Sequence, residues 1–184
     1  MLEIIKITVG LLATNCYLLV DKGELAVVDP GSEGEKILEA VKKTGARPLC
    51  IINTHYHFDH TLANVMIQKK LGVPAFIHEL EKDYTGFEVG RYLKDGDEIK
   101  IGKSALKTVL TPGHTLGSIC LFGPGMVISG DTIFENGVGR WDLPGGSLED
   151  LKKSCAKLSR LIKPGTTVYP GHGEIFKFEK KQWI

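Results

Sequence analysis

NTHYHFDH, residues 53–60, is the stretch of sequence that decides the fold of this chain. It contains three of the chain's six histidines, and it lies between an apolar segment typical of a strand and a segment with a helical pattern. Side chains alternate in an extended segment, so His55 and His57 point to the same side and can bind one cation. Asp59 and His60 follow where the helix begins and can face a second cation. Imidazole and carboxylate groups together suit zinc, iron or manganese, so the motif predicts a metal site.

Three further candidate ligands stand in turns that follow predicted strands. They are His114 in TPGHT, Asp131 in SGDT and His172 in PGHG. Small residues flank all three, and such neighbours let the backbone approach a metal closely. Together with the first motif they bring the candidate ligands to seven, enough for two ions. The remaining histidine, His78, ends a predicted strand without glycine neighbours, and we expect it to be structural or exposed.

The order of the predicted elements indicates an α+β fold. Several strands are followed by a helix, and this arrangement occurs twice, which suggests two sheets packed face to face with helices outside. Ser32 and Glu35 are predicted to form a capping box for the first helix, and Ser147 is predicted to cap the last one. Residues 79–97 are predicted to be a loop or short helix, and residues 132–146 a glycine-rich loop. The predicted strands cover residues 2–9, 11–21, 24–29, 48–53, 74–78, 166–169 and several stretches between 98 and 129, and the predicted helices cover residues 33–44, 61–71 and 148–162.

Length, charge and cysteine usage narrow the function classes. The 184 residues suit a single domain that spans residues 1–184 and buries a sizeable core. The 23 basic and 22 acidic residues leave no excess of positive charge to bind a nucleic acid, so we expect a small-molecule substrate. No apolar run approaches the roughly 20 residues of a membrane span, and Glu3 and Thr8 argue against a secretory signal. The four cysteines lack a C-x-x-C pair and are expected to be buried thiols of a cytoplasmic protein: Cys16, Cys50, Cys120 and Cys155.

The ordered motif His55-x-His57-x-Asp59-His60, with His114, Asp131 and His172 after it, resembles the metallo-β-lactamase superfamily. The resemblance extends from the Asp29-Pro30-Gly31 turn to Gly173. It implies a four-layer αββα sandwich of two mixed sheets flanked by helices, with two metal ions at one edge between the sheets. It also implies how the ligands divide: His55, His57 and His114 bind one ion, Asp59, His60 and His172 bind the other, and Asp131 bridges them.

Asp131 distinguishes branches of this family, because β-lactamases that use two zinc ions commonly have a cysteine at that position. The chain is most similar to glyoxalase II, a hydroxyacylglutathione hydrolase, and to its short relatives. Two differences from full-length glyoxalase II affect the expected binding of the thiol carrier, glutathione. Only 12 residues follow His172, where that enzyme has a helical domain, and Asp142 replaces a tyrosine. Arg140 replaces a substrate-binding lysine and is expected to bind a substrate carboxylate. The similarity rests on residues 15–17, 113–118, 130–134 and 139–146.

The resemblance and the ligand set together predict the hydrolysis of a thioester. Two divalent ions, expected to be zinc with iron or manganese as alternatives, share a bridging hydroxide that attacks the carbonyl carbon. A thiolate needs little protonation to leave, so no strong general acid is required. Asp59 is predicted to be both a ligand and a proton acceptor. Asp29, Thr54 and Thr115 are candidates to orient the imidazoles from behind.

Three alternatives remain open at this stage. Persulfide dioxygenases share the motif but hold a single iron through positions that match His55, His57 or His114, and Asp131. A nuclease of the same superfamily is disfavoured by the neutral charge. A non-catalytic metal-binding module is disfavoured because a structural metal site tends to be closed and mononuclear, with four ligands.

Overall fold

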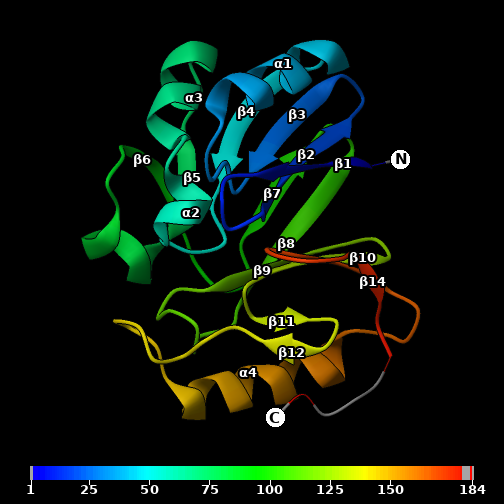
Figure 1. Cartoon of the computed structure of the whole chain (residues 1–184). Helices are drawn as coiled ribbons and strands as arrows, with labels where there is room; N and C mark the ends of the chain where they lie inside the picture. Colours follow the sequence, from blue (N-terminus) through cyan, green and yellow to red (C-terminus); the bar gives the residue numbers. More distant parts are fainter. Residues whose placement is uncertain (1, 180–182, 184) are drawn as a thin grey trace.

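The computed structural model describes residues 2–179 and residue 183. Figure 1 shows four layers: α1 (Gly34–Thr44) and α3 (Asn64–Leu71), then two β-sheets, then α4 (Leu148–Leu161) on the far side. Each of the two large sheets has six strands. This arrangement confirms the predicted α+β fold and the four-layer sandwich.

The first sheet is mixed. It consists, in spatial order, of β1 (Glu3–Val9), β2 (Thr14–Asp21), β3 (Glu24–Val28), β4 (Arg47–Ile52), β5 (Ala75–His78) and β6 (Val89–Leu93). The first three strands are antiparallel neighbours, whereas β3 to β6 run parallel to one another. Parallel neighbours need a crossover connection, and the chain passes through α1 between β3 and β4 and through α3 between β4 and β5. These two helices cover the outer face of the sheet (Figure 1).

The second sheet is also mixed. It consists, in spatial order, of β14 (Phe176–Lys177), β13 (Thr167–Pro170), β10 (Met126–Gly130), β9 (Ile119–Gly123), β8 (Ser104–Leu110) and β7 (Glu98–Ile101). All neighbours are antiparallel except β10 and β13, which run parallel and are connected through α4. The glycine-rich stretch between β10 and α4 contains a small hairpin of β11 (Ile133–Phe134) and β12 (Gly137–Val138).

Apolar side chains from both sheets fill the space between them. In β2, Tyr17 and Leu19 point into this space, and Leu18 points towards the helical layer, as strand alternation requires. All three side chains are completely buried, because both faces of β2 are covered. On the other side of the molecule, Leu151 and Leu158 of α4 pack against the second sheet. The strands are therefore held on both faces, and the loops at their ends are left to form a site.

The predicted capping box at the start of α1 is wrong. The N-cap is Glu33, whose φ of 51° lies in the left-handed region and whose side chain does not cap the helix. Its carboxylate instead accepts a hydrogen bond from the backbone N–H of Gly10 at 2.8 Å. The Ser32 hydroxyl is buried without a hydrogen-bond partner among the described residues. The prediction for Ser147 is confirmed, since its hydroxyl accepts a hydrogen bond from the backbone N–H of Asp150 at 3.2 Å.

Two other stretches differ from the predicted elements. The helix predicted at residues 61–71 is divided into α2 (Phe58–Thr61) and α3. Residues 79–97, predicted to be a loop or short helix, contain a short 3-10 helix, η1 (Glu79–Tyr84), in agreement with that prediction, but also the strand β6, which was not predicted. β6 lies at the sheet edge with mostly exposed side chains, so it lacks the apolar alternation that marks a strand in a sequence.

The cysteine and His78 predictions agree with the structure. All four cysteines are buried and free of disulfides. His78 is buried and structural, because its Nδ1 accepts a hydrogen bond from the backbone N–H of Leu80 at 3.3 Å and caps η1. Within the described part of the chain, no helix is long and apolar enough to cross a membrane.

Candidate metal centre

The seven candidate ligands come together on the loops that follow four strands. His55, His57, Asp59 and His60 lie on the loop after β4 and in α2, and His114, Asp131 and His172 lie on the loops after β8, β10 and β13. The first of these strands belongs to one sheet and the other three to the second sheet. Beside the site the two sheets are joined by a hydrogen bond of 2.7 Å from the backbone N–H of Asn15 to the carbonyl of Gly171. The site therefore exists only where the two sheets meet.

One group of ligands consists of His55, His57 and His114, whose ligand nitrogens lie within 4.8 Å of one another. The Nε2 atoms of His55 and His114 are 3.3 Å apart. The Nε2 atom of His57 is buried and has no hydrogen-bond partner within the described residues. A buried polar atom without a partner is unusual and calls for a binding role. This group thus offers three imidazole nitrogens to a divalent cation.

The second group consists of Asp59, His60 and His172, whose ligand atoms also lie within 4.8 Å of one another. Oδ2 of Asp59 is 3.4 Å from Nε2 of His60 and 3.2 Å from Nε2 of His172. Asp131 lies between the groups, with its Oδ2 3.6 Å from Nε2 of His114 and 3.4 Å from Nε2 of His172. These positions suit two ions with Asp131 as a shared ligand, which is the division that the resemblance implies.

Hydrogen bonds at Nδ1 orient four of the imidazoles. Two of these bonds involve side chains: Nδ1 of His55 lies 3.1 Å from Oγ1 of Thr54, and Nδ1 of His60 lies 3.0 Å from Oδ2 of Asp29. The other two involve backbone carbonyl oxygens: Nδ1 of His114 lies 2.6 Å from that of Arg140, and Nδ1 of His172 lies 3.0 Å from that of Leu12. Asp29 also accepts hydrogen bonds from the backbone N–H and the hydroxyl of Thr54, both at 2.7 Å. A proton held at Nδ1 leaves the Nε2 lone pair free for a cation. Asp29 and Thr54 therefore lie behind the ligands, as predicted, whereas Thr115 forms hydrogen bonds with Glu81 and Ser118 and, within the described residues, none with an imidazole.

Glu81 is a residue of this site that the sequence analysis missed. Its carboxylate is completely buried and accepts hydrogen bonds from the backbone N–H of Tyr56 at 3.1 Å and from the hydroxyl of Thr115 at 2.8 Å. It also accepts a short hydrogen bond from the backbone N–H of Gly117. Glu81 thus connects the loop of His55 and His57 to the loop of His114. It lies in η1, within a polar segment that gave no sign of burial.

The two groups of ligands differ in charge. Burial lowers the pKa of His55 well below its usual range, lowers that of His57 to about 4, and also lowers that of His114. These imidazoles are neutral, which is the form that binds a metal. In the second group burial acts in the same direction, but neighbouring aspartates outweigh it: they raise the pKa of His60 well above its usual range and that of His172 to about 10. The aspartates thus create a site that attracts positive charge.

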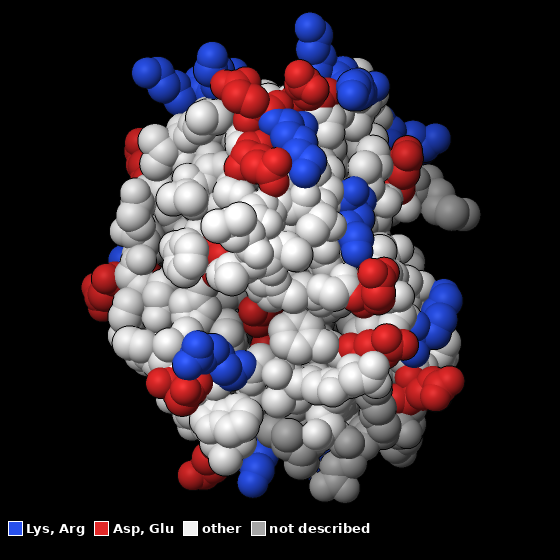
Figure 2. All heavy atoms as spheres, in the orientation of Figure 1, with Lys and Arg blue, Asp and Glu red and all other residues white. Residues whose placement is uncertain are grey.

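A cavity of about 550 Å³ that opens to the surface is lined by five of the seven candidate ligands: His57, Asp59, His114, Asp131 and His172. Arg140 lines this cavity, but its guanidinium forms two hydrogen bonds with the Asp142 carboxylate, at 2.8 Å and 2.9 Å. The remaining wall is mostly apolar and includes Leu12, Tyr56, Phe58, Phe134, Leu143 and Pro144. Figure 2 shows the same character, since the middle of that face is largely uncharged and charged side chains gather nearer its margins.

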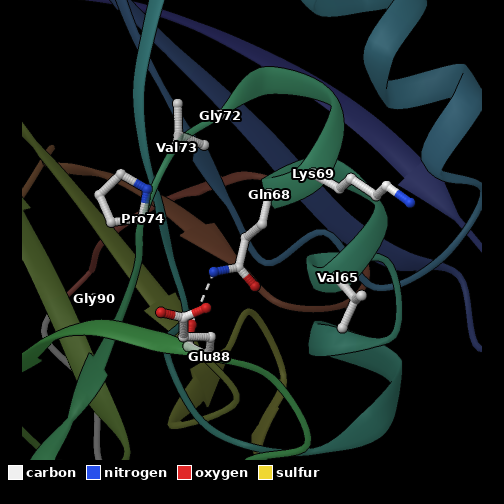
Figure 3. Close-up of a pocket in the computed structure, with 8 residues that line it drawn as sticks. All are labelled: Val65, Gln68, Lys69, Gly72, Val73, Pro74, Glu88 and Gly90. Atoms are coloured by element: carbon white, nitrogen blue, oxygen red, sulfur yellow. Dashed lines mark hydrogen bonds between the residues drawn. The ribbon is translucent and has the colours of Figure 1, made fainter.

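A second hollow, of about 470 Å³, lies between α3 and the start of β5 and β6 (Figure 3). The side-chain amide of Gln68 donates a hydrogen bond of 2.8 Å to the carbonyl oxygen of Glu88 across it. None of the seven candidate ligands lines this hollow. The cavity beside the ligands is therefore where chemistry is expected.

Comparison with known proteins identifies the family. The model of the metallo-β-lactamase superfamily matches residues 9–172. A probable metallo-hydrolase of Bacillus subtilis is 36% identical over 91% of this chain and 89% of its own length. Among solved structures, TTHA1623 in a di-iron-bound form is 32% identical with a TM-score of 0.85, over 94% of both chains.

A B3 metallo-β-lactamase, BLEG-1, is 26% identical with a TM-score of 0.87 and covers 95% of this chain and 94% of its own. The family match spans all seven candidate ligands, and the histidine and aspartate groups found here are able to hold metal ions. The chain therefore belongs to the metallo-β-lactamase superfamily, whose members include metallo-hydrolases.

Proposed function

We propose that this protein is a binuclear metal-dependent hydrolase that cleaves a small thioester, in the manner of glyoxalase II. The observation that carries the proposal is the pair of ligand groups with Asp131 between them. His55, His57 and His114 would hold one ion, Asp59, His60 and His172 the other, and Asp131 both. When bound, two such ions lower the pKa of a shared water and polarise the substrate carbonyl. We propose zinc, and the di-iron-bound form of TTHA1623 makes iron the first alternative.

The acid–base character of the cavity supports a thioester over an amide. Asp59 and Asp131 are the carboxylates that line it. Burial raises the pKa of each, but the neighbouring histidines outweigh this effect and lower both pKa values, that of Asp131 well below its usual range. Neither of these two carboxyls is therefore protonated and able to donate to a leaving group. A thiol, with a pKa of roughly 8.5, leaves as an anion without such help.

Asp59 is the proposed acceptor of a proton from the attacking water. Its Oδ2 accepts a hydrogen bond from the Thr14 hydroxyl at 3.0 Å, which orients the carboxylate. Asp59 lies at the wall of the cavity and remains partly accessible. In the reaction, the oxygen of water bonds to the acyl carbon, the C–S bond breaks, and its electron pair leaves on sulfur. The products are a carboxylic acid and a thiol.

The test is to purify the protein, count the metals per chain and assay hydrolysis with zinc, manganese or iron. The panel contains S-D-lactoylglutathione, simple acyl thioesters and a β-lactam. We expect two metals per chain, thioester hydrolysis and loss of activity on chelation. Absence of thioester hydrolysis with every metal would refute the proposal. Oxygen uptake with glutathione persulfide by a form with one iron would instead identify a persulfide dioxygenase.

A further inference from the structure

Exposed apolar side chains gather beside the metal centre. The turn between β1 and β2 spans residues 10–13, where the sequence analysis expected a strand to begin. Leu11 in this turn is fully exposed, and Leu12 is 55% exposed. Across from them, Phe58 is 67% and Leu62 is 66% exposed. Clustered exposed apolar side chains cost solubility, so such a patch usually marks a binding site.

These side chains enclose a small cavity of about 240 Å³ between the β1–β2 turn and α2. Leu12, Phe58 and Asp59 line both this cavity and the larger one that contains the candidate ligands. The two cavities therefore adjoin each other, and Asp59 is part of the wall that they share. If the reacting carbonyl of a substrate lies near Asp59, the groups on its two sides can occupy one cavity each.

The turn that forms one wall is held at both ends. The backbone N–H of Gly10 donates to the Glu33 carboxylate at 2.8 Å, and the carbonyl oxygen of Leu12 lies 3.0 Å from Nδ1 of His172. The first contact attaches the turn to the start of α1, and the second attaches it to a candidate metal ligand. The small cavity is therefore preformed, and its position relative to the metal centre is set.

The charge of the two cavities bears on what they bind. Among the described residues that line them, Arg140 is the only lysine or arginine, and its guanidinium is already paired with Asp142. Of the described residues that line the small cavity, Asp59 alone is charged. Glutathione carries two carboxylates, for which the described residues of these walls offer no unpaired lysine or arginine. An apolar group, by contrast, gains from burial against Leu11 and Leu62.

We propose that the small cavity binds the apolar acyl chain of the thioester substrate, while the larger cavity holds the thiol carrier. This inference rests on the proposed thioesterase function and names its substrate class as thioesters of apolar acyl groups. The size and polarity of the two cavities decide which one binds the acyl chain and which one binds the thiol carrier. Arg140, which is paired with Asp142, lines only the larger cavity, so we assign the polar carrier to that cavity and the hydrocarbon chain to the smaller one.

The first test compares N-acetylcysteamine thioesters of acetyl, butanoyl, hexanoyl and octanoyl groups. We expect kcat/KM to rise about fourfold per methylene until the chain fills the cavity. Leu62→Asp should lower the octanoyl-to-acetyl ratio of kcat/KM at least tenfold. Leu161→Asp is the matched control, because Leu161 is 48% exposed on α4 and lies outside both cavities. Thermal unfolding of both variants checks that they fold.

A binding measurement separates this inference from the proposed function. Calorimetry with the protein as purified compares octanoate with acetate, and we expect octanoate to bind at least tenfold more tightly and Leu62→Asp to remove the difference. If thioesters are cleaved, the dependence of kcat/KM on acyl chain length tests the inference. A kcat/KM that does not change with chain length overturns the inference, while the proposed thioesterase function stands. If no thioester is cleaved, the proposed thioesterase function fails and the binding of octanoate tests the apolar site. Tighter binding of octanoate than of acetate supports the apolar site, and equal binding overturns the apolar site as well as the function.

Discussion

His57 and His78 show that a histidine becomes a candidate ligand only through what surrounds it. Both lie near the end of a strand of the first sheet. Nε2 of His57 is buried without a partner in the described part of the chain, and its ring lines the larger cavity. Nδ1 of His78 is already satisfied by the backbone N–H of Leu80. The first histidine has a nitrogen to offer a metal, and the second acts as a helix cap.

We expect His57→Ala to lower the metal content per chain and to abolish hydrolysis, because the first ion would lose one of its three imidazoles. Elemental analysis and a thioester assay measure the two effects. His78→Ala is the control: it should keep metal and activity and lose only about 1 kcal/mol of stability with the cap. Full metal content and activity in His57→Ala would contradict the metal assignment.

Glu81 is a single residue that holds two of the loops that carry candidate ligands, because its carboxylate accepts hydrogen bonds from both loops. Gln in its place keeps the shape but turns an N–H group towards groups that themselves donate hydrogen bonds. We expect Glu81→Gln to destabilise the fold by about 1–3 kcal/mol and to weaken metal binding roughly 10- to 100-fold. Thermal unfolding and competition with a chelator measure the two effects.

The control for this variant is Glu79→Gln. Glu79 lies in the same short helix, and its exposed carboxylate is 3.6 Å from the Lys94 ammonium. An exposed ion pair contributes little, so this change should affect neither stability nor metal affinity measurably. Equal behaviour of the two variants would mean that Glu81 does not position the ligand loops.

At the scale of elements, the position of α2 decides whether its ligands reach the centre. α2 is only four residues long and carries Asp59 and His60. It lies directly against the turn after β3, where a Cβ atom on Gly31 would overlap the backbone carbonyl of Asp59. Glycine at this position thus permits the close approach of two backbones.

We expect Gly31→Ala to displace α2, with a loss of about 1–3 kcal/mol in stability and at least a tenfold loss in affinity for the second ion. Gly86→Ala is the matched control, since a Cβ atom there would meet open space. Thermal unfolding and metal titration compare the two variants. A Gly31→Ala protein with unchanged metal affinity would show that the turn does not hold α2 in place.

At the scale of the whole molecule, the candidate centre joins the two sheets. His55 and His57 follow a strand of the first sheet, whereas His114, Asp131 and His172 follow strands of the second. Any ion shared by these side chains is therefore a connection between the two halves of the sandwich. Metal binding and the stability of the fold are then linked.

We expect removal of metal by a chelator to lower the melting temperature, and re-addition of zinc or manganese to restore it. A metal present at 100 times its dissociation constant stabilises the fold by about 2.7 kcal/mol. Calorimetry of the treated and restored protein measures the effect, and the His57→Ala variant should show a smaller shift. Identical unfolding with and without metal would contradict a site shared between the sheets.

Much of the architecture, and the side chains that gather as candidate ligands, could be predicted from the sequence. The layered fold followed from strands and helices in a repeated order, and a cap such as Ser147 involves only residues within one turn. The seven candidate ligands were recognisable because His55, His57, Asp59 and His60 crowd into one segment and the other three stand in similar turns. These patterns involve residues that are close in the sequence, so they can be recognised without knowing the tertiary contacts.

Long-range contacts decided the rest. Glu33 bonds to the β1–β2 turn instead of completing a local cap, and Glu81 in a polar segment becomes a buried link between two loops. The pairing of Arg140 with Asp142 and the small cavity beneath Leu11 also depend on how distant segments fold back. The free energy of each contact comes from burial or hydrogen bonding to residues far along the chain, and no local pattern in the sequence records it.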